Sequence, residues 1–189
     1  MKQSDMKGHL AAFVTIFIWG TTFISTKVLL KSFSPIEILF IRFLIGYATL
    51  WLVYPHQLKP AEKKQELCFA AAGLCGVTLY YLMENMALTY TLASNVGVII
   101  SIAPFFTAIF SFFLRKGDKP GKRFFLGFVM AMAGICLISG SSGAALSLNP
   151  LGDVLAIGAA IIWAVYSLLT RKIGDFGYHV VQATRRTFF

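Results

Sequence analysis

Charged residues are scarce in this sequence. Only 13% of its 189 residues are Asp, Glu, Lys or Arg, and 57% are apolar, whereas soluble domains have roughly 25% charged and 45–50% apolar residues. This composition disfavours a soluble enzyme with one globular core and indicates a membrane protein. Cysteine is also sparse. Because Cys68, Cys75 and Cys136 all fall within apolar runs, we interpret them as reduced packing residues and not as a disulfide framework.

The sequence also lacks the short motifs of several enzyme classes. It has neither a G-x-x-x-x-G-K-[ST] phosphate loop nor a G-x-G-x-x-G fingerprint, so no binding of ATP or of a dinucleotide is predicted. His9, His56 and His179 are not spaced as metal ligands with a cysteine, and no serine has the sequence context of a nucleophile. We therefore expect no catalytic residue, no metal site and no cofactor, and a protein that is not an enzyme.

Long apolar runs, in contrast, are abundant. Six of them approach the ~20 residues that cross a ~30 Å hydrocarbon core as a helix, and none shows the period-2 alternation of a barrel strand. They cover residues 10–30, 36–54, 67–89, 93–114, 124–139 and 151–170. The predicted fold class is all-α: a polytopic membrane helix bundle with about six transmembrane helices.

The basic residues predict the orientation of this bundle. All but three of the 17 Lys and Arg residues occur at the amino terminus, in the second and fourth loops and in the carboxyl-terminal tail. Because cytoplasmic loops retain Lys and Arg, we expect a cytoplasmic amino terminus and external loops near Ser34, Tyr90 and Ser142. Orientation accounts for the basic clusters, so it is favoured over a patch that binds nucleic acid or lipid headgroups.

An internal repeat is found when the sequence is compared with itself. An offset of 144 residues aligns residues 8–27 with residues 152–171 and pairs five identical residues, among them Trp19 with Trp163. The two copies are offset by five helices, an odd number, so the copies cross the membrane in opposite directions. Such inverted repeats give many secondary transporters their two alternating conformations.

The repeat divides the chain into two predicted units. Residues 1–147 form the first five-helix repeat, and residues 148–189 begin a second, inverted one. Two full copies would make a longer molecule, so we expect roughly one hundred further residues to be missing from this chain.

Short motifs spread along the chain carry a resemblance to a known family. They are Trp19-Gly20-Thr21-Thr22-Phe23 continuing to Lys27, Pro35 leading to Arg42-Phe43, Ala87-Leu88-Thr89-Tyr90-Thr91, Pro104, and Gly152-Asp153 continuing to Trp163-Ala164-Val165-Tyr166 and Arg171. In these stretches the chain resembles the EamA type of the drug/metabolite transporter superfamily. The resemblance implies a ten-helix inverted-repeat carrier that moves amino acids, metabolites or drugs, commonly outward, across a bacterial cytoplasmic membrane.

Four polar side chains share a depth within the predicted spans, ~5–9 Å from the outer ends at 1.5 Å per residue. They are Lys27, Arg42, Glu84 and Asn85. In one interpretation Glu84 only neutralises Arg42 or Lys27 and fixes helix packing. In the other, a basic side chain binds an anionic group of the substrate, and Glu84 takes up a proton during transport.

Further candidates lie elsewhere within the spans. Trp19 suits either core packing or a cavity wall, and the same alternatives apply to Tyr80, Tyr81 and Asn95. Pro104 interrupts the fourth run, where a kink can line a cavity. The candidate substrate-binding residues are Trp19, Lys27, Arg42, Tyr81, Glu84, Asn85 and Asn95.

Small residues recur at every fourth position of the last run, which permits close helix contact in lipid. They are Gly152, Ala156, Ala160 and Ala164. Because the second repeat is incomplete, we expect this row to lack part of its partner surface and to face lipid or another chain.

The expected function is secondary transport, in the export direction, of small metabolites such as amino acids or drugs. The alternatives are a membrane scaffold that transports nothing and an inactive fragment of such a carrier. Expected partners are a small-molecule substrate, the lipid bilayer, and either further carboxyl-terminal helices or a second copy of the chain, but no nucleic acid. The expected location is the bacterial cytoplasmic membrane.

Overall fold

The structure is a computed structural model that describes residues 3–56, 58, 62–115, 120–141 and 149–188. This part of the chain is helical and has no strand, which confirms the predicted all-α class. Its helices are α1 (Gln3–Leu29), α2 (Pro35–Val53), α3 (Lys63–Ala72), the π-helical η1 (Gly73–Leu79), α4 (Tyr80–Tyr90), α5 (Ala93–Ile100), α6 (Ala103–Arg115), α7 (Lys122–Ser141), α8 (Pro150–Gly174) and α9 (Val180–Phe188).

Five helical segments in the described residues are long and apolar enough to cross a membrane. They are Gly8–Leu29, Pro35–Val53, Lys63–Tyr90, Ala93–Phe113 and Pro150–Gly174. The remaining predicted run, residues 124–139, falls within the 20-residue helix α7. These helices confirm a polytopic membrane bundle, and the exposure of large apolar side chains along α1 and α2 is the surface that lipid requires.

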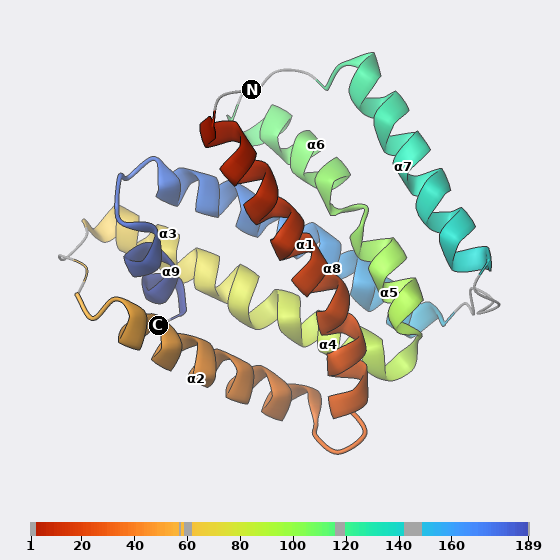
Figure 1. Cartoon of the computed structure of the whole chain (residues 1–189), viewed down its shortest axis with the longest axis horizontal. Helices are drawn as coiled ribbons and strands as arrows, with labels where there is room; N and C mark the ends of the chain where they lie inside the picture. Colours follow the sequence, from red (N-terminus) through yellow and green to blue (C-terminus); the bar gives the residue numbers. More distant parts are fainter. Residues whose placement is uncertain (1–2, 57, 59–61, 116–119, 142–148, 189) are drawn as a thin grey trace.

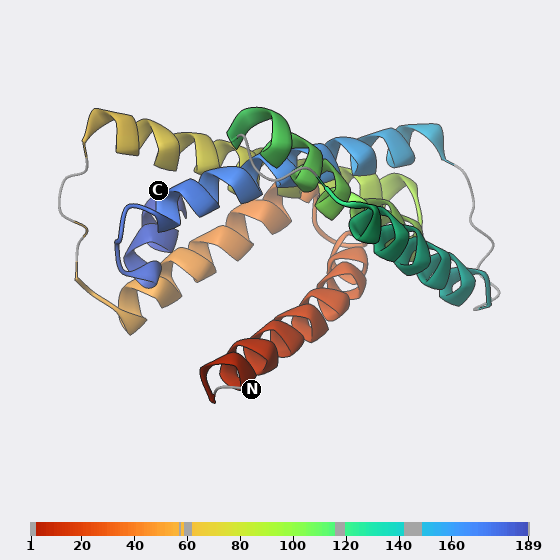
Figure 2. The same ribbon diagram turned by 90° about the horizontal axis from the view of Figure 1, so that it is seen from above.

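The bundle is built around two long antiparallel segments. In Figures 1 and 2, α3, η1 and α4 follow one another as one long helical segment, and α8 lies beside it with the opposite chain direction. α5 and α6 also contact α8, α2 packs on α4 and α9, and α7 contacts α5. Figure 2 shows α1 crossing this layer at one end and diverging from it toward its amino terminus.

Small side chains let α4 and α8 approach closely. Ala87 of α4 and Ala156 of α8 are both fully buried in one apolar cluster, and a Cβ added at Gly158 would lie 2.2 Å from the Met83 methyl carbon. The expectation that the small-residue row of α8 faces lipid or another chain is therefore wrong. Its residues are buried because helices of the first 115 residues already cover this face of α8.

Two helix irregularities lie at the centre of the bundle. The fourth predicted span is broken between α5 and α6 at Ser101 and Ile102, as expected from Pro104, which has no backbone N–H to continue the α-helical ladder. The third span changes to π-helix over Gly73–Leu79, a feature the apolar pattern does not predict. π-Helical turns are rare and occur often at functional sites.

Polar contacts join the ends of several helices at one end of the bundle. Lys27 Nζ donates to the carbonyl oxygen of Thr91 at 2.8 Å, and Asn149 Nδ2 donates to that of Tyr90 at 2.8 Å. The predicted external turns near Ser34 and Tyr90 therefore belong to one end of the bundle (Figure 1). The third predicted external loop, near Ser142, lies outside the described residues.

The opposite end is closed by α9. Arg185 Nη1 donates to the carbonyl oxygen of Tyr54 at 2.9 Å, and Arg186 donates twice to Glu66 Oε2, at 3.0 and 2.8 Å. These arginines therefore attach α9 to the end of α2 and to α3.

Candidate functional site

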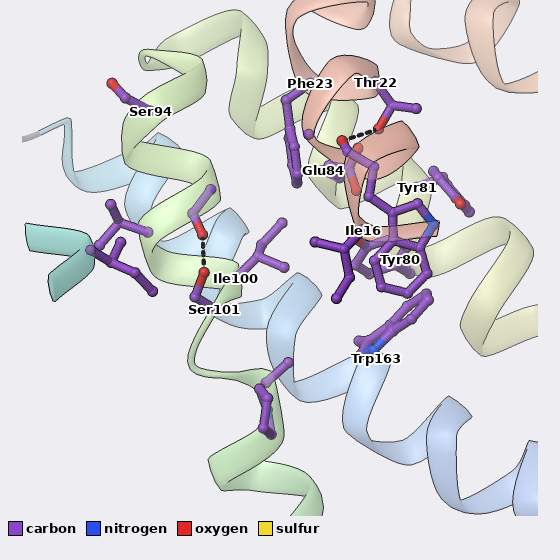
Figure 3. A pocket seen from close by; sticks show the side chains of 17 residues that line it. Ile16, Thr22, Phe23, Tyr80, Tyr81, Glu84, Ser94, Ile100, Ser101 and Trp163 are labelled. Atoms are coloured by element: carbon purple, nitrogen blue, oxygen red, sulfur yellow. Dashed lines mark hydrogen bonds between the residues drawn. The ribbon is translucent and has the colours of Figure 1, made fainter. Parts of the chain in front are cut away.

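A cavity of about 620 Å³ lies between α1, α4, α5, α6 and α8 (Figure 3). Its volume is within the ~300–1,000 Å³ of small-molecule sites. The described residues that line it are Ile16, Trp19, Gly20, Thr22, Phe23, Tyr80, Tyr81, Glu84, Ser94, Gly97, Val98, Ile100, Ser101, Ala103, Pro104, Ile135 and Trp163.

The break between α5 and α6 forms one side of the cavity. Ser101, Ala103 and Pro104 all line it, so the irregular backbone at membrane depth lies against an open space, where the bilayer tolerates it. The Ser101 hydroxyl donates to the carbonyl oxygen of Gly97 at 2.7 Å (Figure 3). The predicted kink at Pro104 is therefore confirmed as a break that borders a cavity.

Aromatic rings form the opposite wall. Trp19 of α1 and Trp163 of α8 meet edge to face, with ring centroids 5.5 Å apart and planes at 88°. Tyr80 lies 4.7 Å from Trp163 and 4.9 Å from Tyr81. Edge-to-face and tilted contacts of this kind are the favoured arrangements of aromatic pairs, so the wall is held in a fixed geometry by three helices.

Glu84 is the charged residue of the described cavity lining. Its side chain is 2% exposed, and Tyr80 lies one helical turn earlier on α4. Within the described part of the chain no ion pair joins Glu84 to Arg42. A carboxylate held so far from water without an ion pair is costly, which makes it a candidate functional group.

Lys27, predicted to share the site, lies outside the cavity lining. Its ammonium group donates to the carbonyl oxygens of Leu88 and Thr91 at the end of α4. Those carbonyls have no partner within the helix, and the negative end of the helix dipole favours a cation there. The contacts of Lys27 are therefore those of a helix cap.

Arg42 lies behind the aromatic wall. Its Nη2 donates to Thr26 Oγ1 at 3.0 Å, and its guanidinium carbon lies 5.2 Å from the centre of the Tyr81 ring. Arg42 therefore contacts a residue of the cavity lining without being part of that lining.

The two candidate asparagines also lie outside the lining. Asn85, which is 1% exposed, donates from Nδ2 to the carbonyl oxygen of Pro35 at 3.1 Å and so connects α4 to the start of α2. Asn95 Nδ2 donates to Thr91 Oγ1 at 3.2 Å within the turn that begins α5. Of the seven candidates, the cavity thus brings together Trp19, Tyr81 and Glu84.

Trp163 lines the cavity, but reasoning from the sequence left it out of the candidate set. The signal was present, because the 144-residue register pairs Trp163 with Trp19, and the two rings meet in the structure. Tyr80 was considered without being selected, and it lies between Glu84 and Trp163.

The fold and the cavity define the class as a polytopic helical membrane protein with a solute-sized internal space. Comparison with protein families identifies the family to which the chain belongs. Residues 6–140 match the EamA-like transporter family, and the chain belongs to this family.

Similar proteins come from both bacteria and archaea. An uncharacterized transporter of Archaeoglobus fulgidus is 33% identical over 173 residues, which are 89% of this chain and 59% of that protein. The uncharacterized transporter YvbV of Bacillus subtilis is 28% identical, over 88% of this chain and 54% of its own length. The uncharacterized inner membrane transporter YedA of Escherichia coli K12 is 29% identical, over 86% of this chain and 53% of its own length. The chain thus spans between half and three fifths of these relatives. No solved structure matches it.

Proposed function

We propose that this chain is part of a secondary transporter that exports small metabolites such as amino acids or drugs across the cytoplasmic membrane. The observation that carries the proposal is the cavity, which joins an aromatic wall, a buried carboxylate and a broken helix at the centre of a membrane bundle. Family membership supports transport, and the resemblance of the sequence motifs favours export.

In this proposal the cavity is the substrate site. Trp19, Tyr81 and Glu84 contact the solute, together with Tyr80 and Trp163. Lys27, Arg42, Asn85 and Asn95 act indirectly, since each holds an element of the surrounding bundle in place.

The proposed movement is alternating access between two inverted units, residues 1–147 and 148–189. The contact between Trp19 and Trp163 supports this division, because it joins residues that are equivalent in the two copies. The break at Ser101 and Ile102 and the π-helix η1 supply irregular backbone at which helix halves can reorient.

Counterflow of radiolabelled amino acids and drugs into proteoliposomes tests the proposal. Saturable exchange of unmodified solute is the expected result, and Glu84→Gln should lower its rate by ~10-fold or more, because contacts to charged groups contribute ~1.5–3 kcal/mol. Glu62→Gln is the matched control, since Glu62 is exposed and its side chain makes no capping bond.

Two outcomes would contradict the proposal. A folded chain that exchanges no solute would favour a scaffold or an inactive part of a carrier, and chemical conversion of the solute would indicate an enzyme. Inside-out and right-side-out vesicles compared in the same assay report the direction of transport.

A further inference from the structure

We propose that the cavity selects organic cations, meaning an ammonium group carried on an aromatic or aliphatic body, over anions and zwitterions. This inference rests on the proposed function and names the substrate class of the same cavity. It differs from the expectation that Arg42 or Lys27 binds an anionic group of the substrate.

The charges around the cavity carry the first step. Within the described lining the charge is negative, from Glu84, and no Lys or Arg is present. Lys27 and Arg42, the two basic candidates, already bond to the protein's own oxygen atoms. An anionic solute would therefore meet a carboxylate in an apolar site without a compensating cation, which is strongly unfavourable.

The aromatic rings carry the second step. Trp19, Tyr80, Tyr81 and Trp163 line the cavity together with Glu84. Figure 3 shows Tyr80, Tyr81 and Trp163 on the same side of the cavity as Glu84. Trp and Tyr faces attract cations, and desolvated contacts of this kind contribute ~2 kcal/mol or more. Arg42 makes such a contact with the Tyr81 ring from outside the lining.

Two hydroxyl groups of the lining, those of Thr22 and Ser101, carry the third step. Thr22 Oγ1 donates to the carbonyl oxygen of Trp19 at 2.7 Å, and Ser101 Oγ donates to that of Gly97 at 2.7 Å. Both hydroxyls have used their single proton and present only lone pairs to a solute. Acceptor groups of this kind bind an ammonium N–H and offer nothing to a carboxylate.

Three small ligands that share a phenyl ring and a two-carbon chain test the inference: phenethylammonium, L-phenylalanine and hydrocinnamate. They carry a cation, a zwitterion and an anion. Two of the chain's three tryptophans line the cavity, so in a Trp51→Phe background quenching of Trp19 and Trp163 fluorescence reports binding there. Phenethylammonium should bind at least ~10-fold tighter than either of the other two.

Variants of Glu84 and Trp19 separate charge from aromatic contact. Glu84→Gln should remove most of the ~10-fold preference for the cation, and Glu62→Gln should leave it unchanged. Trp19→Leu should weaken binding of phenethylammonium, which the fluorescence of Trp163 still reports. This variant provides a second test if Glu84→Gln does not fold. Near-ultraviolet circular dichroism shows whether each variant keeps its aromatic packing.

The inference is overturned if phenylalanine or hydrocinnamate binds as tightly as phenethylammonium, if none of the three quenches, or if folded Glu84→Gln keeps the cation preference. If phenylalanine or hydrocinnamate binds as tightly as phenethylammonium and a non-cationic solute shows counterflow, the proposed transport function stays intact. Absence of counterflow for every solute would instead count against the proposed function.

Discussion

Lys27 acts as a helix cap, a role that its position in the sequence does not predict. Because its ammonium group caps the carbonyl oxygens of Leu88 and Thr91, Lys27→Met should lower the free energy of unfolding in detergent by ~1.5–3 kcal/mol. Lys31→Met, at an exposed position in the turn that follows α1, should change it little. Unchanged stability with lost solute binding would instead make Lys27 a ligand.

Arg42 and Glu84 should be energetically coupled, whereas Lys27 and Glu84 should not. Arg42 contacts the Tyr81 ring, which lines the cavity together with Glu84, so a double-mutant cycle with Arg42→Gln and Glu84→Gln should give a coupling of ~0.5–3 kcal/mol in unfolding. The same cycle with Lys27→Gln should be additive within ~0.5 kcal/mol. Additive losses for Arg42 and Glu84 would show that their charges do not interact.

Depth in the membrane predicted part of this site. Lys27, Arg42, Glu84 and Asn85 share a depth, but depth does not give the direction in which a side chain leaves its helix. In the structure, Lys27 and Asn85 donate hydrogen bonds to backbone carbonyl oxygens of neighbouring elements. Of the four residues that share this depth, Glu84 alone lines the described cavity. Trp19 and Tyr81 reach it as well, in ring contacts with Trp163 and Tyr80 respectively.

At the scale of the element, the π-helix η1 depends on a glycine at its contact with α8. A Cβ at Gly76 would lie 2.3 Å from Tyr166 Cδ2, and a packed ring cannot move aside as a flexible chain end does. Gly76→Ala should therefore destabilise the fold by ~1–3 kcal/mol. Gly134→Ala in α7, where nothing lies within 4 Å, should be neutral or stabilising. Equal unfolding midpoints for the two variants would contradict the close contact.

The elements themselves were predictable to different degrees. Apolar runs of membrane-spanning length predicted the long helices, and Pro104 predicted the break between α5 and α6, because both signals are local. The π-helix was not predictable, since Gly73–Leu79 has the same apolar composition as an α-helical run. The contacts of α8 with α3, η1, α4, α5 and α6 were missed because a row of small residues does not specify its partner.

At the scale of the molecule, the basic residues predict which end of the bundle is cytoplasmic. A membrane-impermeant thiol reagent applied to intact cells should label Ser32→Cys, on the exposed turn between α1 and α2, and should not label Lys63→Cys at the start of α3. The reverse pattern would overturn the predicted orientation, although the fold would remain as described.

The central claim is that solute passes through the cavity between α1, α4, α5, α6 and α8. Ile100 lies within this cavity in Figure 3, so Ile100→Cys, in a chain whose Cys68, Cys75 and Cys136 are replaced by Ala, places one thiol there. The most direct measurement is counterflow before and after this thiol is alkylated with a bulky reagent, compared with the same treatment of Lys31→Cys. Passage through the cavity predicts that alkylation abolishes exchange for Ile100→Cys and leaves exchange unchanged for Lys31→Cys. Undiminished exchange by fully alkylated Ile100→Cys would contradict it.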